Sequence, residues 1–218
     1  MDDKEKVFFP LYHVLKRMLD IFMALIGLII LAPVWMILWI VIIGEDGSPV
    51  FIKQKRIGKD GRHFSAFKFR SMHTSSLSEC VNVQAYENDA RITKIGKILR
   101  NTAIDESPQL INILRGDMSF VGPRPLLSCE VEVHNPSPSD IEDIPGYDQR
   151  ISVVPGLTGI AQLCMPRDVS REKKFEYDLM YISKRCLLTD IKLILFSLAV
   201  TFLGRWEKRG RKLSVHCD

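Results

Sequence analysis

The sequence predicts an α+β fold that is mainly helical, in which a helix that enters a membrane is followed by a small domain. Residues 21–43 are a run of 23 residues without a charge, alternating residues at 49–69 predict a short β-hairpin, and amphipathic patterns predict helices further along. The 218 residues are 46% hydrophobic and 26% charged. This composition excludes a disordered, collagen-like or small disulfide-rich protein.

The uncharged run is the strongest feature of the chain. As a helix it is about 35 Å long, enough to cross a bilayer core and too long for the apolar part of a signal peptide. Pro33 follows Ala32 near its middle and predicts a bend, because proline removes a backbone donor and clashes with the preceding turn. Two interpretations stay open at this point: a re-entrant helix that enters and leaves by the same face, and a kinked single span.

Charged residues stand at both ends of this segment. Lys16, Arg17 and Asp20 precede it, and we expect them in the headgroup layer, where snorkelling reduces the cost of their charge. Five basic residues follow it: Lys53, Lys55, Arg56, Lys59 and Arg62. With basic residues on both sides, the positive-inside rule selects no orientation for a simple span. The formal charge of +4 selects no partner either, since it suits nucleic acid, anionic lipid or a phosphate-rich ligand.

Residues 49–52 and 63–69 are typical of two strands around a glycine-bounded turn. Phe67 and Phe69 of the second strand share one face, and Lys68 and Arg70 lie on the opposite face. This basic face is either solvated or directed at an anion.

Residues 91–101 predict an amphipathic helix. Its apolar stripe consists of Ile92, Ile95, Ile98 and Leu99, beside a basic ridge of Arg91, Lys94, Lys97 and Arg100. The ridge is either a solvated face or a face that lies on anionic lipid.

Residues 187–204 form a second apolar segment, but Asp190 and Lys192 disfavour a second span. An interfacial helix anchored by Arg205 and Trp206 and a buried core helix are both compatible with this pattern.

The stretch from Asp105 to Gly116 carries the clearest chemical signal. Ser107 and Pro108 predict the N-cap and first residue of a helix that ends at Gly116, which places Asp105 and Glu106 just outside its N-terminus. A helix N-terminus attracts phosphate, and carboxylates beside a phosphate need a bridging cation such as Mg²⁺. A carboxylate there is a nucleophile on phosphorus or a metal ligand. Alternatively, both acidic residues lie at the helix start without a chemical function.

Two stiff loops follow. Arg124 stands between two prolines, which stiffen the backbone. Its guanidinium is either presented to a phosphate at little entropic cost, or the segment is only a rigid loop. Residues 154–159 contain a Pro-Gly turn with a second glycine nearby, which indicates either simple turn chemistry or a close backbone approach to a ligand.

The five cysteines include no C-x-x-C pair. Free thiols in a reducing compartment are the simplest interpretation, in preference to a metal site.

Taken in order, the motifs resemble the bacterial sugar transferase family, the monotopic phosphoglycosyl transferases. They are KRxxD (16–20), RIG (56–58), FKFRSM (67–72), RIT (91–93), LR (99–100), DE (105–106), PQL (108–110), GDMSFVGPRP (116–125), PGLTGIAQ (155–162) and YDxxY (177–181). The resemblance covers roughly residues 12–200. Each motif alone is moderately specific, whereas the ordered set is highly specific.

The resemblance implies an enzyme that transfers a sugar-1-phosphate from a UDP-sugar to undecaprenyl phosphate and releases UMP, the first membrane step of surface polysaccharide or glycoconjugate synthesis. It implies a monotopic protein of the bacterial inner membrane, with a re-entrant helix broken at Ala32-Pro33 and an active site on the cytoplasmic face. Inner-membrane lipids are then further partners. Nucleic acid is not expected, and a homodimer stays an open alternative.

The resemblance also implies roles for individual residues. Asp105 is expected to be the nucleophile that takes the phosphosugar covalently, assisted by Mg²⁺, and Glu106 to supply acid–base or metal-binding support. The expected substrate- and phosphate-binding residues are Arg100, Arg124, Gln162, Asp178, Lys68 and Arg70.

The chain departs from the family pattern at a few positions. Many members have Ser where Ala32 stands, Trp where Ile160 stands, and Val-Asn-Gly-Arg where residues 163–167 read Leu-Cys-Met-Pro-Arg. The last two differences fall in a loop expected near the sugar, and they leave the sugar itself undetermined.

We expect three parts: a membrane-embedded helix at 1–48, a cytosolic catalytic domain at 49–190, and an interfacial helix with a tail at 191–218. Two other function classes remain as alternatives. One is a non-catalytic single-pass scaffold, and the other is a membrane-bound phosphohydrolase that uses the same aspartate without a polyprenyl acceptor.

Overall fold

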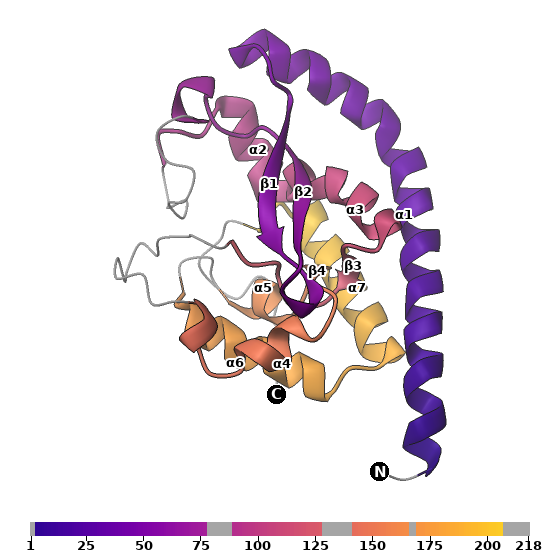
Figure 1. Cartoon of the computed structure of the whole chain (residues 1–218). Helices are drawn as coiled ribbons and strands as arrows, with labels where there is room; N and C mark the ends of the chain where they lie inside the picture. Colours follow the sequence, from indigo (N-terminus) through magenta and orange to yellow (C-terminus); the bar gives the residue numbers. More distant parts are fainter. Residues whose placement is uncertain (1–2, 78–88, 128–140, 166–168, 207–218) are drawn as a thin grey trace.

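The computed structural model describes residues 3–77, 89–127, 141–165 and 169–206. Helix α1 (Asp3–Asp46) runs along one side of a small α+β domain and then curves over the end of a β-hairpin (Figure 1). It is continuous through Pro33. Among the described residues it is the one helix long and apolar enough to cross a membrane, and only 6% of its most apolar stretch is buried. The mainly helical α+β fold predicted from the sequence is confirmed.

Both ends of the apolar part of α1 are fastened to the domain. At the first end, Lys16 pairs with Asp190 at 2.8 Å, the Asp20 carboxylate accepts from the Phe120 amide at 3.0 Å, and Arg17 donates to the last carbonyls of a later helix. The domain therefore compensates these charges, and their position in the headgroup layer stays a prediction.

At the other end, the Glu45 carboxylate accepts hydrogen bonds from the Lys94 and Ile95 amides of helix α2 (Lys94–Thr102), at 2.7 and 3.0 Å. The buried Arg70 donates to the Gly47 carbonyl at 2.7 Å. Arg70 therefore holds the end of α1 in place, and it does not belong to the phosphate-binding face predicted for it together with Lys68.

The hairpin pairs β1 (Phe51–Ile57) with β2 (His63–Phe69) in antiparallel register from Phe51–Phe69 to Ile57–His63. Its turn contains the short helix η1 (Lys59–Gly61), where Asp60 and Gly61 have positive φ. The predicted hairpin is confirmed, although its first strand lies later than 49–52. A second, parallel sheet joins β3 (Ser119–Val121) to β4 (Gly156–Thr158). Strands this short carry no periodic signal, and the sequence did not predict them.

The remaining described elements are helical and surround these two sheets (Figure 1). In chain order they are η2 (Thr74–Leu77), η3 (Ile104–Gln109), α3 (Leu110–Arg115), η4 (Ile141–Asp143), α4 (Tyr147–Ile151), α5 (Ile160–Cys164), α6 (Arg171–Ser183) and α7 (Leu187–Phe202). In α2, Leu99 is buried and Ile95 packs against the core, but Ile98 is exposed, and Ile92 of the stripe and Arg91 of the ridge precede the helix. The predicted stripe is therefore narrower than its four residues.

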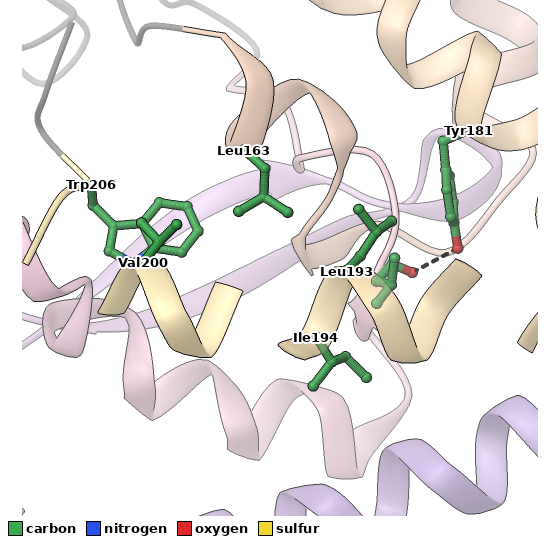
Figure 2. Packing of buried hydrophobic residues seen from close by; sticks show 7 residues of the cluster. Leu163, Tyr181, Leu193, Ile194, Val200 and Trp206 are labelled. Atoms are coloured by element: carbon green, nitrogen blue, oxygen red, sulfur yellow. Dashed lines mark hydrogen bonds between the residues drawn. The ribbon is translucent and has the colours of Figure 1, made fainter. Parts of the chain in front are cut away.

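Helix α7 combines the two interpretations of its sequence. Leu193, Ile194 and Val200 are buried in one cluster with Leu163, Tyr181 and Trp206 (Figure 2). The other face exposes large apolar side chains: Leu188, Ile191, Leu195, Phe196, Leu198, Phe202 and Leu203. The helix is thus a core helix whose outer face stays apolar.

Candidate active site

The acidic pair lies on the 3-10 helix η3, between α2 and α3. Asp105 and Glu106 are buried, at 4% and 5% exposure. Ser107 and Pro108 also lie inside η3, and α3 begins only at Leu110. The predicted N-cap at Ser107 is therefore wrong, because the chain makes a tighter turn before it becomes α-helical.

Two cations hold the carboxylate of Glu106. Its Oε1 accepts from Lys68 Nζ at 2.7 Å and from Arg124 Nη2 at 2.5 Å, and its Oε2 accepts from Arg124 Nη1 at 3.1 Å. This fork-on-fork geometry is the strongest that an arginine and a carboxylate form. Both oxygens of Glu106 thus serve to hold basic side chains.

Lys68 is largely buried in this cluster, with 13% of its side chain exposed. Burial is the main cause that lowers its pKa to about 8, with help from the positive charges of Arg124 and Arg56, and the negative charges of Glu106 and Asp105 oppose the shift. Neighbouring Asn112 fixes the strand that carries Lys68, because its side chain bonds both the Phe67 amide and the Ser65 carbonyl. The ammonium is therefore held in place beside the acidic pair.

Arg124 is carried by a loop that neighbouring backbone clamps. Ideal Cβ atoms built on Gly122, Gly156 and Gly159 would lie 2.6, 2.1 and 2.4 Å from backbone atoms across the clamp. The Pro155–Gly159 segment thus makes a close backbone approach, but to the Arg124 loop rather than to a ligand.

Side chains fasten the same loop from two further directions. Arg56 donates to the Pro125 carbonyl at 2.9 Å, and Arg150 donates to the Arg124 carbonyl at 2.5 Å. The buried Asp178 accepts from Arg150 Nε at 2.8 Å. Burial raises the pKa of Asp178, opposed mainly by the charge of Arg150. Asp178 therefore supports the Arg124 loop indirectly, by holding Arg150. No sequence motif indicated Arg150.

Two other predicted site residues occupy more peripheral positions. Gln162 on α5 lies over Gly159, with its Oε1 2.5 Å from where a Cβ of that glycine would stand. Arg100 on α2 acts electrostatically on Asp89. There burial opposes ionisation, but hydrogen bonds from Arg91 and the positive charges of Arg91 and Arg100 lower the pKa of Asp89.

The described residues contain no group of three or more His, Cys, Asp or Glu side chains that could hold a metal. Asp105 fits one ligand of Mg²⁺, an ion that binds through one or two carboxylates and completes its shell with waters and substrate phosphates. Glu106 does not fit as a second ligand in this geometry, because Lys68 and Arg124 engage both of its oxygens.

The membrane helix reaches this site directly. Trp35 of α1 donates its indole N–H to the Ser107 hydroxyl at 2.9 Å, two residues after Asp105. In the sequence, Trp35 is one apolar residue of the uncharged run and no motif includes it. The feature that could have indicated its role is the indole N–H, because a buried or membrane-embedded indole N–H requires a hydrogen-bond acceptor.

The segment that departs from the family pattern is only partly described. Leu163 is a core residue, and residues 166–168 lie outside the described part of the chain. Cys186 is a free, exposed thiol, but Cys164 is disulfide-bonded. The expectation of free thiols is therefore wrong at Cys164.

Comparison with known proteins identifies the family of the chain. The family model described as bacterial sugar transferase matches residues 11–204. The UDP-glucose:undecaprenyl-phosphate glucose-1-phosphate transferase of Klebsiella pneumoniae is 37% identical over 197 residues, with 88% of this chain and 41% of that protein covered. The undecaprenyl-phosphate galactose phosphotransferase of Salmonella typhimurium is 35% identical over 205 residues, with 88% and 41% covered.

A relative of similar length also matches. The exopolysaccharide production protein PSS of Rhizobium leguminosarum bv. phaseoli is 37% identical over 198 residues, with 88% of this chain and 96% of that protein covered. The chain thus spans about two fifths of the Klebsiella and Salmonella relatives and nearly all of the Rhizobium protein.

Proposed function

The chain belongs to the bacterial sugar transferase family, and we propose that it transfers a sugar-1-phosphate from a UDP-sugar to undecaprenyl phosphate, with release of UMP. The observation that carries this proposal is the buried Asp105 beside the Lys68–Glu106–Arg124 cluster, on a turn that the membrane helix contacts. A nucleophile among cations suits a diphosphate donor, and contact with the membrane helix suits a lipid acceptor.

The proposed chemistry consists of two displacements at phosphorus. A carboxylate oxygen of Asp105 attacks the β-phosphorus of the UDP-sugar, and the bond from that phosphorus to the bridging oxygen breaks, so that UMP leaves with the electron pair. A phosphate oxygen of undecaprenyl phosphate then attacks the same phosphorus, and the Asp105 carboxylate leaves. The product is an undecaprenyl diphosphate sugar, and Asp105 returns to its starting state.

The basic side chains neutralise the phosphates during these steps. Lys68 and Arg124 converge on one carboxylate, so a diphosphate that enters beside Glu106 meets two positioned cations. The Arg124 side chain is 38% exposed and is the cation accessible to a donor that arrives from water. We assign Glu106 to positioning these two cations. Bound Mg²⁺, with Asp105 as its protein ligand, would add charge neutralisation at the diphosphate.

We also propose that α1 is re-entrant and that the protein is monotopic in the inner membrane, with its site on the cytoplasmic face. Asp20 and Glu45 lie at opposite ends of the apolar run, yet both bond to the same domain. A polar domain cannot lie on both sides of a bilayer or within its core, so contacts at both ends favour entry and exit on one side. The cytoplasmic face is part of this proposal because the family resemblance implies it.

The test is UMP release by the protein in nanodiscs, with Mg²⁺ present, across a panel of UDP-sugars. We expect one sugar to give UMP release and a lipid-linked product that needs undecaprenyl phosphate. Asp105→Asn should reduce turnover by at least about 10³-fold, whereas Asp143→Asn, an exposed carboxylate on η4, should leave it unchanged. UDP-glucose and UDP-galactose come first in the panel because the names of the relatives include glucose and galactose.

Other outcomes identify the alternatives. Phosphate or sugar phosphate released without an acceptor would indicate a hydrolase. A folded, Mg²⁺-supplied protein that is silent with the full panel would indicate a scaffold.

A further inference from the structure

A pocket of about 270 Å³ lies at the start of α1, where this helix meets the hairpin turn and the connection between α6 and α7. The described residues that line it include four Lys or Arg side chains, one histidine and one carboxylate: Lys16, Arg17, Lys59, Arg185, His13 and Asp20. The volume is just below the range of roughly 300–1,000 Å³ that holds drug-sized ligands, so the pocket suits a smaller ligand. The excess of cations favours an anion.

The cations of this pocket converge from separate segments of the chain. Lys59 belongs to the hairpin turn η1, and Arg185 lies between the end of α6 and the start of α7. Their positive charges, together with that of Lys16, all act on the ring of His13. These side chains are therefore within electrostatic range of one another. Like charges brought together repel, and an anion placed among them relieves that repulsion.

The carboxylates near this pocket are engaged by donors of the protein itself. The buried Asp190, which contacts two lining residues, accepts from Lys16 at 2.8 Å and from Tyr12 at 2.9 Å. Asp20 accepts from the Phe120 amide at 3.0 Å. These contacts join the start of α1 to α7 and to β3, so this wall of the pocket is formed before any ligand arrives, which reduces the ordering cost of binding.

The pocket is separate from the candidate active site. Of the described residues that line it, none belongs to η3, whereas Gly116, the C-cap of α3, does line it. The six residues of α3, about 9 Å at the standard rise, lie between this pocket and η3. Arg17 donates to the Ile113 and Leu114 carbonyls at 2.6 and 2.8 Å. The negative end of α3 is therefore compensated and does not oppose an anion.

We propose that this pocket binds an anionic phosphate group through Lys59 and Arg185. Arginine holds phosphate with two parallel N–H donors, and lysine adds a point charge. The group is either the phosphodiester of an anionic lipid headgroup or free phosphate. His13 and Lys16 precede the apolar run that begins at Ile21 by roughly 8–12 Å along the helix, which corresponds to the headgroup layer in the topology proposed above. This binding goes beyond the transfer reaction and does not depend on it.

The double variant Lys59→Gln/Arg185→Gln tests the pocket, and Lys55→Gln/Lys184→Gln is its matched control. Lys55 and Lys184 are exposed, lie close to the two lining residues in the sequence, and do not line the pocket. Each double variant removes two positive charges from the same parts of the chain. A difference between the two pairs therefore reports the pocket and not the net charge of the protein.

Thermal unfolding in micelles of a neutral detergent measures binding without any turnover. Phosphatidylglycerol, phosphatidylcholine or inorganic phosphate is added at increasing concentration. A ligand at about ten times its Kd should raise the Tm of the wild type and of the control pair by about 3–6 °C. The lining pair should bind at least tenfold more weakly, so its Tm should rise by at most about 1–2 °C at the same concentration.

The comparison also separates this pocket from the cations at Glu106. Phosphate that binds at Lys68 and Arg124 stabilises both double variants equally. Lys59→Gln alone changes one exposed turn side chain and should weaken binding at least threefold. It repeats the test if Arg185→Gln impairs folding.

Each outcome decides the proposal. A Tm shift that the lining pair loses supports the pocket, and it identifies a lipid headgroup if only phosphatidylglycerol causes it, or free phosphate if inorganic phosphate causes it at the same concentration. Equal shifts in the two double variants, or no shift with any of the three additions, would overturn the pocket. An equal shift with phosphatidylcholine, whose headgroup has no net charge, would show a general lipid effect and would overturn it as well.

Discussion

The clamp between the Arg124 loop and β4 gives a sharp prediction for Gly156→Ala. A Cβ at Gly156 would lie 2.1 Å from the Gly122 amide nitrogen and 2.6 Å from both the Gly122 Cα and the Thr158 carbonyl oxygen. All three are backbone atoms, so no side-chain rotation can relieve the overlap, and the two segments must separate.

The energetic cost follows from the hydrogen bonds that this separation breaks. Besides the β3–β4 strand pairing, three backbone bonds join the segments: Ser119 N to Pro155 O, Gly122 N to Thr158 O, and Gly156 N to Pro123 O, at 2.8 to 2.9 Å. At about 1 kcal/mol each, their loss destabilises the protein by about 3 kcal/mol. For a chain of this size, that is a decrease in Tm of roughly 6–12 °C.

Thermal unfolding in detergent, followed by circular dichroism, measures this effect. Gly44→Ala is the control, because a Cβ at Gly44 meets nothing within 4 Å and alanine favours the helix. It should leave Tm unchanged or raise it slightly. Because the clamp carries Arg124, Gly156→Ala should also reduce turnover at temperatures where it is still folded. A Gly156→Ala protein that unfolds within 2 °C of the wild type would refute this reasoning.

Three further predictions concern buried charges. Asp178→Asn should destabilise the protein by about 3 kcal/mol, since it leaves Arg150 buried without its counter-ion, and a native Tm would contradict this. The pKa of Lys68 is lowered from 10.5 to about 8 in the folded state, so the unfolded chain binds more protons between pH 8 and pH 10.5. The contribution of Lys68 to the free energy of unfolding should therefore rise with pH across that range. Turnover should fall above pH 8, because the Lys68 ammonium loses its proton. Lys68→Arg should flatten that fall in the pH–rate profile, and an unchanged profile would exclude Lys68 as its cause. Asp190→Asn should weaken the 2.8 Å contact with Lys16 and increase hydrogen exchange at the start of α1, with about 1–3 kcal/mol lost, whereas unchanged exchange would show that other contacts hold this end.

Local patterns in the sequence predict a large part of the fold. Three elements depend only on neighbours within a few positions: the uncharged run of 23 residues, the alternating hairpin and the amphipathic helix near 94–102. They can therefore be predicted without a structure. The ordered motifs also identified Asp105, Glu106, Lys68 and Arg124, four side chains that lie in one cluster. These four residues can be located by residue type and order alone, and both are properties of the sequence that folding does not change.

The partners of those side chains were decided only by the tertiary structure. Glu106 is a natural metal ligand by residue type, yet it binds Lys68, 38 positions away, and Arg124, 18 positions away. Asp178 reaches the site only through Arg150. No periodic pattern links positions so far apart, because their proximity is set by how the elements pack.

The role of α1 shows the same division. Its composition is sufficient to predict that it enters a membrane, because the cost of exposing apolar residues to water depends on residue type alone. Its composition cannot predict that Glu45 caps α2, that Arg70 holds its end, or that Trp35 bonds to Ser107. Those bonds depend on direction and distance between groups up to 72 positions apart, and only the folded chain sets both.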